Sequence, residues 1–533
     1  MTAQPQPTPP PPEIGFGTLS DLVRAHARRQ PDRPALVQED GSLSYAGLDA
    51  LMDRVAAALH RDGLRARDSI TVCAGTSIEY AALFLGALRA GVVVAPLAPS
   101  CTAQELAGMA ADSGAKLIFL DAAVAKALEP VADGISARRL ALDESAAGAS
   151  FKAWLAPAGA TPVPVEVEPG WAFNIIYSSG TTGTPKGIVQ SHAMRWSHIQ
   201  RAAAYGYDSQ SVTLLATPLY SNTTLVSFFP TLGHGGTVVL MGKFDAANYL
   251  ALAAKHRATH TMLVPVQYHR LMALPAFDSF DLASFRMKFS TSAPFQSALK
   301  ADVLERWPGG LVEFYGMTEG GGTCILSAHE HPSKLHTVGP PAEGHDIRLI
   351  DENGVEVPHG QKGATGEVVG HSAGMMSGYH DKPEKTAEAE WYSPEGKRFI
   401  RTGDVGRFDE DGFLVLMDRK KDMIISGGFN IYPSDLEEVL RGHPQVSDCA
   451  VVGVPSEQWG ETPVAFVVPK DEGQVTSEAL REWTNARVNK IQRLAAVELI
   501  EHLPRSAIGK ILKRELRDTY LPNSPESPTL SIR

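Results

Sequence analysis

The chain has 533 residues, of which 44% are hydrophobic and 20% are charged, and its formal net charge at pH 7 is -11. This length exceeds what one hydrophobic core supports, so two or more domains are expected. The composition is that of a soluble globular protein, and the negative charge argues against nucleic acid as the main partner. No apolar run approaches the roughly 18 residues that a membrane-spanning helix needs.

The two ends of the chain are predicted to be flexible tails. Residues 1–16 are rich in proline and lack the basic-then-apolar order of a signal peptide, and residues 521–533 carry no periodic pattern. The four cysteines are widely scattered, without the close pairs of a metal site; they are Cys73, Cys101, Cys324 and Cys449. They are typical of free thiols in a reducing compartment, so a cytoplasmic protein is expected.

The first 400 residues alternate short apolar segments with helical patterns. Strands are expected at residues 69–73, 92–96, 115–120, 237–241 and 260–264. A helical pattern over residues 78–90 ends at Gly91. Strands separated by helices predict layered α/β subdomains with mostly parallel sheets.

The pattern changes near residue 340. Strand-like segments are now joined by the turns Glu352-Asn353-Gly354 and Glu410-Asp411-Gly412, which suit hairpins. From residue 421 the pattern is α+β, with a helix expected at residues 477–490 and a capping box formed by Ser434 and Glu437. We therefore predict an N-terminal domain over residues 17–420, with a β-rich subdomain at about 340–420. A mobile C-terminal domain is predicted over residues 421–520.

The most informative stretch of the chain is residues 177–187, with the sequence YSSGTTGTPKG. It follows an apolar segment, residues 171–176, that is expected to form a buried strand. Glycine lets backbone amides approach an anion, and Lys186 adds a positive charge, so the stretch predicts a phosphate-binding loop. A flexible linker is the alternative, although linkers seldom place Pro-Lys-Gly directly after a turn. The spacing is not that of a Walker A loop.

Further motifs follow this loop in a fixed order. They are Tyr315-Gly316-Met317-Thr318-Glu319, Gly366-Glu367 leading to Gly378-Tyr379, Arg401-Thr402-Gly403-Asp404, Asp418-Arg419-Lys420-Lys421-Asp422, residues 426–431 and residues 504–510. With them, residues 20–518 resemble the adenylate-forming superfamily of acyl-CoA synthetases, luciferases and non-ribosomal peptide adenylation domains.

The resemblance implies an ATP-dependent acid–thiol ligase. A carboxylate would attack the α-phosphate of ATP to give an acyl-adenylate and pyrophosphate, and the thiol of coenzyme A would then displace AMP. Two anions meet in the first step, so positive charge and Mg²⁺ are required.

The resemblance also implies roles for individual residues. Glu319 would hold Mg²⁺, Thr318 would contact the α-phosphate, and Asp404 would accept hydrogen bonds from the ribose hydroxyls. The other residues implied to bind ATP are Thr181, Thr182, Lys186, Ser292, Ala293, Pro294, Tyr315, Gly316 and Arg419. An ordinary loop acid, a core tyrosine and surface cations are the competing interpretations of Glu319, Tyr315, Lys186 and Arg419.

The C-terminal domain would supply the mobile part of the site. Lys510 would bridge the carboxylate and the α-phosphate during adenylation, and Lys421 would be the hinge about which the domain rotates. After the rotation, the tunnel for coenzyme A would be lined by Ser426, Gly427, Gly428 and Phe429. The neighbouring cations Lys513, Arg514 and Arg517 are expected to form a basic helix face that binds nothing.

The acyl pocket departs from the family pattern. Ser221 stands where related enzymes often carry a histidine that gates the thiol. The candidate lining is Tyr220, Asn222, Thr223, Val264, Gln267, Tyr268, Ser292, Gly316, Gly321 and Cys324. This mixed set suits medium-chain or long-chain fatty acids or aromatic acids. No cationic partner for a second substrate carboxylate is evident, which disfavours dicarboxylic acids.

Other functions remain open on this fold. The chain could be a stand-alone adenylation enzyme that loads a carrier protein, or a luciferase-like oxygenase. It could also be a catalytically silent protein that binds acyl-AMP or a nucleotide, although a pure binder needs no mobile Lys510. A monomer or homodimer is expected.

Overall fold

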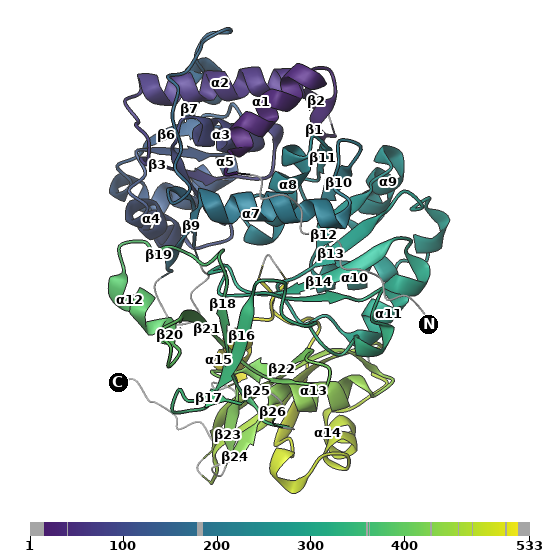
Figure 1. The fold of residues 1–533 in the computed structure, drawn as a ribbon. Coiled ribbons are helices and arrows are strands. Elements are labelled where there is room, and N and C mark those ends of the chain that lie inside the picture. Colours follow the sequence, from purple (N-terminus) through teal and green to yellow (C-terminus); the bar gives the residue numbers. More distant parts are fainter. Residues whose placement is uncertain are drawn as a thin grey trace, which may run out of the picture.

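The computed structural model describes residues 15–39, 41–177, 185–358, 361, 363–426, 429–456, 458–471, 473–506 and 509–520. Within these ranges the chain forms four β-sheets, here called sheets I to IV. The first half of the chain forms the upper part of the molecule in Figure 1, and the C-terminal part lies at the bottom.

Sheet I has parallel strands at its centre and an antiparallel edge. Its strands, in spatial order, are β19 (Gly378–Tyr379), β9 (Gly187–Ser191), β8 (Ala172–Tyr177), β4 (Val93–Pro96), β3 (Ser69–Cys73), β5 (Leu117–Leu120), β6 (Arg138–Ala141) and β7 (Ala149–Ser150). The associated helices are α2 (Tyr45–Arg61), α3 (Ile78–Arg89), α4 (Ala103–Asp112), α5 (Ala122–Leu128) and α6 (Phe151–Trp154). The expected strand at residues 69–73 is confirmed, and all its residues are buried, as in a parallel sheet covered on both faces.

Sheet II is also mostly parallel. Its strands, in spatial order, are β15 (Cys324–Ser327), β14 (Gly310–Tyr315), β13 (Met287–Ser290), β12 (His260–Leu263), β10 (Val212–Leu215), β11 (Thr237–Leu240), β1 (Pro34–Gln38) and β2 (Gly41–Ser44). The associated helices are α1 (Leu19–Arg29), α7 (His192–Ala202), α8 (Asn222–Gly233), α9 (Ala246–His256), α10 (Pro265–Met272) and α11 (Ser297–Arg306). The layered α/β prediction is therefore confirmed for this part of the chain.

One hydrophobic core joins sheets I and II. It combines buried residues of β3, β5 and β8 with buried residues of β10, β12 and β14. Helices α3 and α8 are apolar on nearly all sides and contribute Phe84, Phe228 and Phe229 to this core. A helix buried all round fits between two layers, so α3 and α8 fix the spacing of the two sheets.

Sheet III is the predicted β-rich subdomain. Its strands are β17 (Glu356–Val357), β16 (Asp346–Ile350), β18 (Gly366–His371), β21 (Arg398–Phe408) and β20 (Glu390–Tyr392), with β22 (Leu414–Arg419) paired to β21. Helix α12 (Pro383–Glu388) precedes β20. Both expected hairpin turns are present, and Gly354 and Gly412 take the positive φ values of 77° and 80° that such turns require.

Sheet IV belongs to the C-terminal part. Its strands are β24 (Phe429–Ile431), β23 (Ile424–Ser426), β26 (Gly460–Pro469), β25 (Val446–Ser456) and β27 (Ala496–Leu499). The helices are α13 (Pro433–Arg441), α14 (Ser477–Asn485) and α15 (Lys513–Tyr520). Helix α14 ends five residues before the predicted end, because the Asn485 side chain bonds both the backbone N–H and the C=O of Leu494 and closes a turn.

Two expectations about charged residues in this part are wrong. Ser434 and Glu437 form no capping box; the carboxylate of Glu437 accepts from the backbone N–H of Val451. Lys513 is not a free surface cation, because its Nζ lies 3.0 Å from Glu437 in a buried ion pair. Arg517 also has a partner and donates to the carbonyl of Gly453. These contacts fasten α15 to β25 and α13.

All four cysteines are free thiols, as expected, and three of them are buried. Across the described ranges, no helix combines the length and apolar character that crossing a bilayer requires.

Candidate active site

The residues predicted to bind the nucleoside meet where sheets II and III adjoin. Tyr315 ends β14, and Asp404 and Arg419 are cross-strand partners in β21 and β22. The Tyr315 hydroxyl donates to Asp404 Oδ2 over 2.8 Å, and Arg419 Nε lies 3.3 Å from Asp404 Oδ1. Burial and the Asp404 charge raise the pKa of Tyr315, so its hydroxyl remains a donor. The Asp404 carboxylate is therefore fixed in orientation before any ligand arrives.

The loop after β14 carries Glu319, and three contacts hold it. Tyr379 donates its hydroxyl to Glu319 Oε1 over 2.9 Å. The backbone oxygen of Glu319 accepts from Met376 N, and that of Thr318 accepts from Gln190 Nε2, over 2.7 and 2.8 Å. Lys186 Nζ lies 4.8 Å from the centre of the Tyr379 ring, a cation–π distance. Lys186, Tyr379 and Glu319 are thus neighbours, as a site for phosphates and their metal ion requires.

The chemistry of Glu319 fits Mg²⁺. No group of three or more His, Cys, Asp or Glu side chains that could hold a metal ion occurs among the residues the structure covers. Mg²⁺ bound to a nucleotide commonly uses one or two carboxylates together with phosphate oxygens and water. A single carboxylate near Lys186 satisfies that need.

A buried network of polar side chains supports the loop that carries Glu319, and the sequence did not predict it. Arg195 is only 1% exposed and donates to Asn174 Oδ1 and to Gln190 Oε1. Asn174 also donates to Gln190, whose amide then reaches Thr318. Fully buried polar side chains need such partners, so the network fixes one position for the loop. Nothing in the sequence motifs marks these three residues.

The segment 292–294 borders the start of α8. Ser292 has a φ of 82°, which is unusual for a residue with a side chain, and its hydroxyl lies 2.6 Å from that of Thr223. Ala293 and Pro294 follow it directly. Strained backbone of this kind clusters at functional sites, which agrees with the predicted role of the segment.

The C-terminal part inserts a tight turn into the site. Gly509 has a φ of 76°, and a β-carbon there would lie 2.8 Å from Val266 Cγ1 in α10. Only glycine fits this close approach. Arg505 braces the turn by donating to the Gly509 carbonyl and to Asp448. Lys510 is carried by this turn to the junction of the N-terminal and C-terminal parts.

Lys510 is a largely buried cation among other charged groups. Burial, together with the charges of Arg419 and Lys421, lowers its pKa to about 8, and the carboxylates of Asp404 and Glu319 oppose the shift. These four residues are therefore within electrostatic reach of Lys510. A lysine with this pKa is still largely protonated at pH 7, when it can neutralise phosphate charge.

The predicted hinge, Lys421, borders this cluster, and the predicted tunnel residues follow it in β23 and β24. The pKa of Lys421 is lowered by burial. Ser426 is buried at the end of β23, whereas Phe429 is 57% exposed. Thr181, Thr182, Gly427 and Gly428 lie outside the described residues, so their roles remain predictions.

The predicted acyl-pocket residues have several different surroundings. Burial near Cys101 and Cys73 raises the pKa of Tyr220 to about 12. Asn222 is the first residue of α8, and Val264 directly precedes α10. The Gln267 side chain accepts a hydrogen bond from the backbone N–H of Val264 and donates one to the carbonyl of Ala216.

Three other members of that set are enclosed by protein. Tyr268 and Cys324 expose no surface; Tyr268 packs on Phe295 and donates to the Phe289 carbonyl. A β-carbon on Gly321 would meet Ile400 at 2.5 Å, so this glycine packs against sheet III. These three residues are therefore enclosed by protein and offer no surface to an acid in this structure.

The chain is similar to known proteins over most of its length. A family model described as AMP-binding enzyme matches residues 23–380, and one described as AMP-binding enzyme C-terminal domain matches residues 435–510. The chain is 34% identical to feruloyl-CoA synthase from an Amycolatopsis species, over 93% of this chain and 97% of that protein.

Two further matches cover nearly the whole chain. Fatty acid–[acyl-carrier-protein] ligase ScoC of Streptomyces coeruleorubidus is 32% identical, over 94% of this chain and 96% of that protein. Among solved structures, ATP-bound MatB from Rhodopseudomonas palustris superposes with a TM-score of 0.84 and 29% identity, over 94% of this chain and 99% of that one.

Proposed function

The chain belongs to the family of AMP-binding enzymes, and from this premise we propose that it is an ATP-dependent acid–thiol ligase that forms acyl-CoA. The acid is a medium-chain or long-chain fatty acid or an aromatic acid, as the mixed pocket lining suggests. The observation that carries the proposal is the turn at Gly509, which packs against Val266 of α10 and brings Lys510 within electrostatic reach of Asp404 and Glu319.

In the first half-reaction, these residues hold ATP and the acid together. Asp404 accepts from the ribose hydroxyls, and Lys510 neutralises the charge that the attacking carboxylate and the α-phosphate bring together. Glu319 and the phosphates would hold Mg²⁺, which would stabilise the negative charge on the departing pyrophosphate. Asp404 is already held by Tyr315 and Glu319 by Tyr379, which supports these roles.

The second half-reaction needs a different arrangement of the C-terminal part. In this structure Phe429 is 57% exposed, and Ser426 is the last residue of β23. A rotation about Lys421 would withdraw Lys510 and bring the segment from Ser426 to Phe429 to the acyl-adenylate. The thiol of coenzyme A would then attack the acyl carbon, and AMP would leave.

A second candidate is a ligase that loads a carrier protein, because the chain is 32% identical to an enzyme named as an acyl-carrier-protein ligase. Both candidates share the first half-reaction and differ in the thiol. A silent nucleotide binder is disfavoured because it has no use for an ammonium placed near Asp404 and Glu319.

The test is the formation of AMP and thioester from ATP, Mg²⁺ and an acid panel from acetate through C4–C16 fatty acids to benzoates and cinnamates. Coenzyme A supports thioester formation if the first candidate holds. Turnover that requires a holo-carrier protein favours the second candidate, and absence of AMP with every acid and both thiols contradicts both.

We also propose a cytoplasmic location and a monomer or homodimer. Fractionation of cells that express a tagged chain, and light scattering of the purified protein, measure the two properties.

A further inference from the structure

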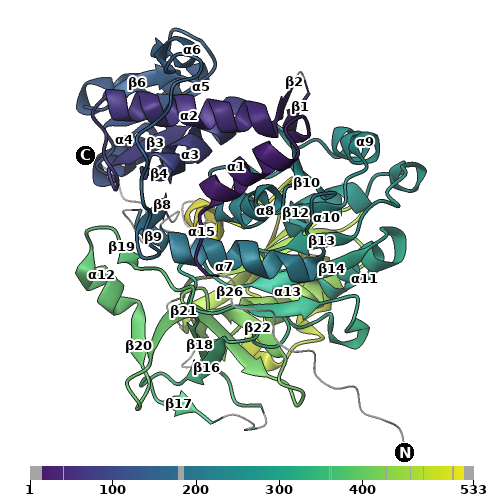
Figure 2. The same cartoon turned by 45° about the horizontal axis from the view of Figure 1, so that its top comes forward.

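A cluster of hydrogen-bond donors lies at the C-terminal end of α7. Arg201 extends from this end, and its Nη1 lies 3.0 Å from Nε2 of His345, the residue before β16. The other ring nitrogen of His345, Nδ1, accepts from the backbone N–H of Thr323 over 2.9 Å. Figures 1 and 2 both show α7 between the upper helices and the strands of sheet III.

The contact between Arg201 and His345 has no acceptor. A neutral imidazole has one donor and one acceptor nitrogen, and Nδ1 is the acceptor because Thr323 donates to it. The proton is therefore on Nε2, which faces the guanidinium of Arg201, a group that can only donate. The guanidinium otherwise contacts only the Ser197 carbonyl, over a long 3.4 Å. An acceptor bound between the two side chains would satisfy both.

The charge around this contact is uncompensated. Within the described ranges, neither Arg201 nor His345 forms an ion pair with a carboxylate. His198, one turn earlier on α7, has a buried Nδ1 without a hydrogen-bond partner. Burial, with the charges of Arg201 and His371, lowers the pKa of His345 to about 4, so this ring is neutral at pH 7 while the field around it is positive. A positive potential at this position attracts an anion.

The cluster adjoins the predicted substrate site. Arg201 is exposed at the end of α7, and His345 beside it is half-buried. Thr323, which holds His345, follows Glu319 by four residues. A β-carbon on Gly316 would lie 3.3 Å from Thr323 Oγ1, so Thr323 stands directly behind the glycine predicted to line the nucleotide and acyl sites.

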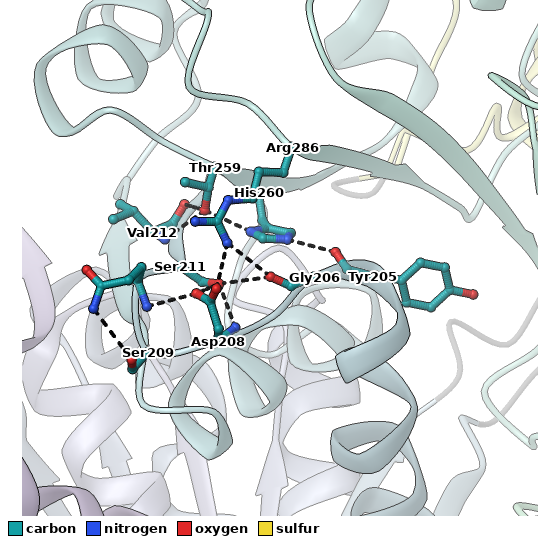
Figure 3. Close-up of polar contacts among 10 residues, drawn as sticks. Tyr205, Gly206, Asp208, Ser209, Ser211, Val212, Thr259, His260 and Arg286 are labelled. Atoms are coloured by element: carbon teal, nitrogen blue, oxygen red, sulfur yellow. Dashed lines mark hydrogen bonds and ion pairs between the residues drawn. The ribbon is translucent and has the colours of Figure 1, made fainter. Parts of the chain in front are cut away.

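The end of α7 is anchored, and an aromatic surface lies beside it. Figure 3 shows the backbone of Tyr205 held by His260 Nε2, over 3.0 Å, while its ring points away from the polar cluster. Arg286 holds the next turn through Asp208 and the Gly206 carbonyl. The half-buried ring of Tyr205 packs edge-on against Phe289 and Phe314, at 5.4 and 5.7 Å between centroids. Apolar and charged surfaces thus meet at this point.

We propose that Arg201 and His345 form the distal end of the acyl site and bind a second carboxylate of the acid, so that the substrate is a dicarboxylic acid with an alkyl or aryl body. This inference rests on the ligase function proposed above. It is opposed to the expectation from sequence that dicarboxylic acids are disfavoured. The sequence does not show this pair, because Arg201 and His345 are 144 residues apart and no motif links them.

The test compares acids that differ only in the distal group: octanoate with octanedioate, and cinnamate with 4-carboxycinnamate. Pyrophosphate release gives kcat/KM for each acid, and the measured quantity is the ratio within a pair. The wild-type chain is expected to prefer the dicarboxylate of at least one pair. Arg201→Met should lower that ratio about 10- to 100-fold, the effect of losing a hydrogen bond to a charged group. Arg201→Lys should retain part of it.

Controls separate this role from a structural one. Arg481→Met removes an arginine that pairs with Glu478 on the remote helix α14 and should leave the ratio unchanged. Melting temperatures identify variants that do not fold. If Arg201→Met does not fold, the same ratio is measured with His345→Phe instead. A wild-type preference for the monoacids, or a ratio that survives both substitutions, overturns the inference and leaves the ligase function standing. Absence of AMP with every acid overturns both.

Discussion

The nucleotide side of the site holds charged groups that already have protein partners, whereas Arg201 and His345, proposed for the acyl side, lack an acceptor. Asp404 lies between Tyr315 and Arg419, and Glu319 accepts from Tyr379. Arg201 and His345 instead face each other as two donors.

This difference follows from what each side must do. ATP is the same substrate in every reaction cycle. Its binding site therefore benefits from groups that are fixed before ATP binds and need no reorganisation. Selection among acids gains from groups that stay unsatisfied until the correct acid supplies the missing acceptor, because a wrong acid leaves them unpaired. The predictions below test how far the partnered side depends on its partners.

The largest effect is expected for Lys510→Ala. Losing the ammonium removes a charge that acts on the transition state of adenylation, so pyrophosphate release should fall about 100-fold or more. Thioester formation from a synthetic acyl-adenylate should be much less affected, because that step does not use this charge. Lys490→Ala, an exposed lysine of the same C-terminal part, is the matched control. Equal losses in both half-reactions would contradict the assigned role.

The next effect is expected for Asp404→Ala. The variant loses a charged acceptor for the ribose and leaves Arg419 without its partner, so kcat/KM for ATP should fall about 10- to 100-fold. KM for the acid should change little. Asp409→Ala alters the same hairpin at a carboxylate that pairs with Lys334, and it should leave ATP kinetics unchanged. A similar loss in both variants would point to damage of sheet III as the cause.

The pH dependence of adenylation should show the titration of Lys510. Its pKa is lowered to about 8, and the protonated form is the active one. The kcat/KM of adenylation should therefore be constant below this pH and fall about tenfold per pH unit above it. Bound ATP is an anion and raises the pKa, so the fall in kcat should occur at a higher pH. Lys510→Arg, which stays protonated, should abolish the fall; an unchanged profile would assign the titration to another group.

The smallest effect is expected for Tyr379→Phe. The change removes one hydrogen bond to Glu319 and keeps the ring beside Lys186, so about a 3- to 10-fold loss is expected. It should appear as a higher Mg²⁺ concentration for half-maximal adenylation. Tyr392→Phe removes a comparable bond, from an exposed tyrosine to Glu390, and serves as the control. No change in the Mg²⁺ requirement would show that Tyr379 does not position the carboxylate.

Much of the fold was predictable because local pattern and burial agree. The strand at residues 69–73 is a short apolar run covered on both faces, and the turns at Gly354 and Gly412 need a residue that tolerates positive φ. The errors concern side chains with more than one possible partner. Glu437 has the spacing of a capping box, but the buried ammonium of Lys513 and the Val451 amide bind it instead.

The site divides in the same way. Tyr315, Glu319, Asp404 and Lys510 lie in contiguous motifs and could be named from the sequence, although the evidence that they are close together comes from the structure. The support formed by Asn174, Gln190 and Arg195 could not be named, since a polar residue in a strand or helix has no sequence signal for burial.

By itself, the sequence determined the layered α/β class, the order of the motifs and the chemistry of the nucleotide side, because each depends on residues that are close together in the chain. Tertiary structure decided which distant residues become neighbours. It placed Gly509 against α10, paired Lys513 with Glu437, and set Arg201 against His345. Hydrogen bonding and charge act over a few ångströms in space, so these interactions exist only once the sheets are assembled.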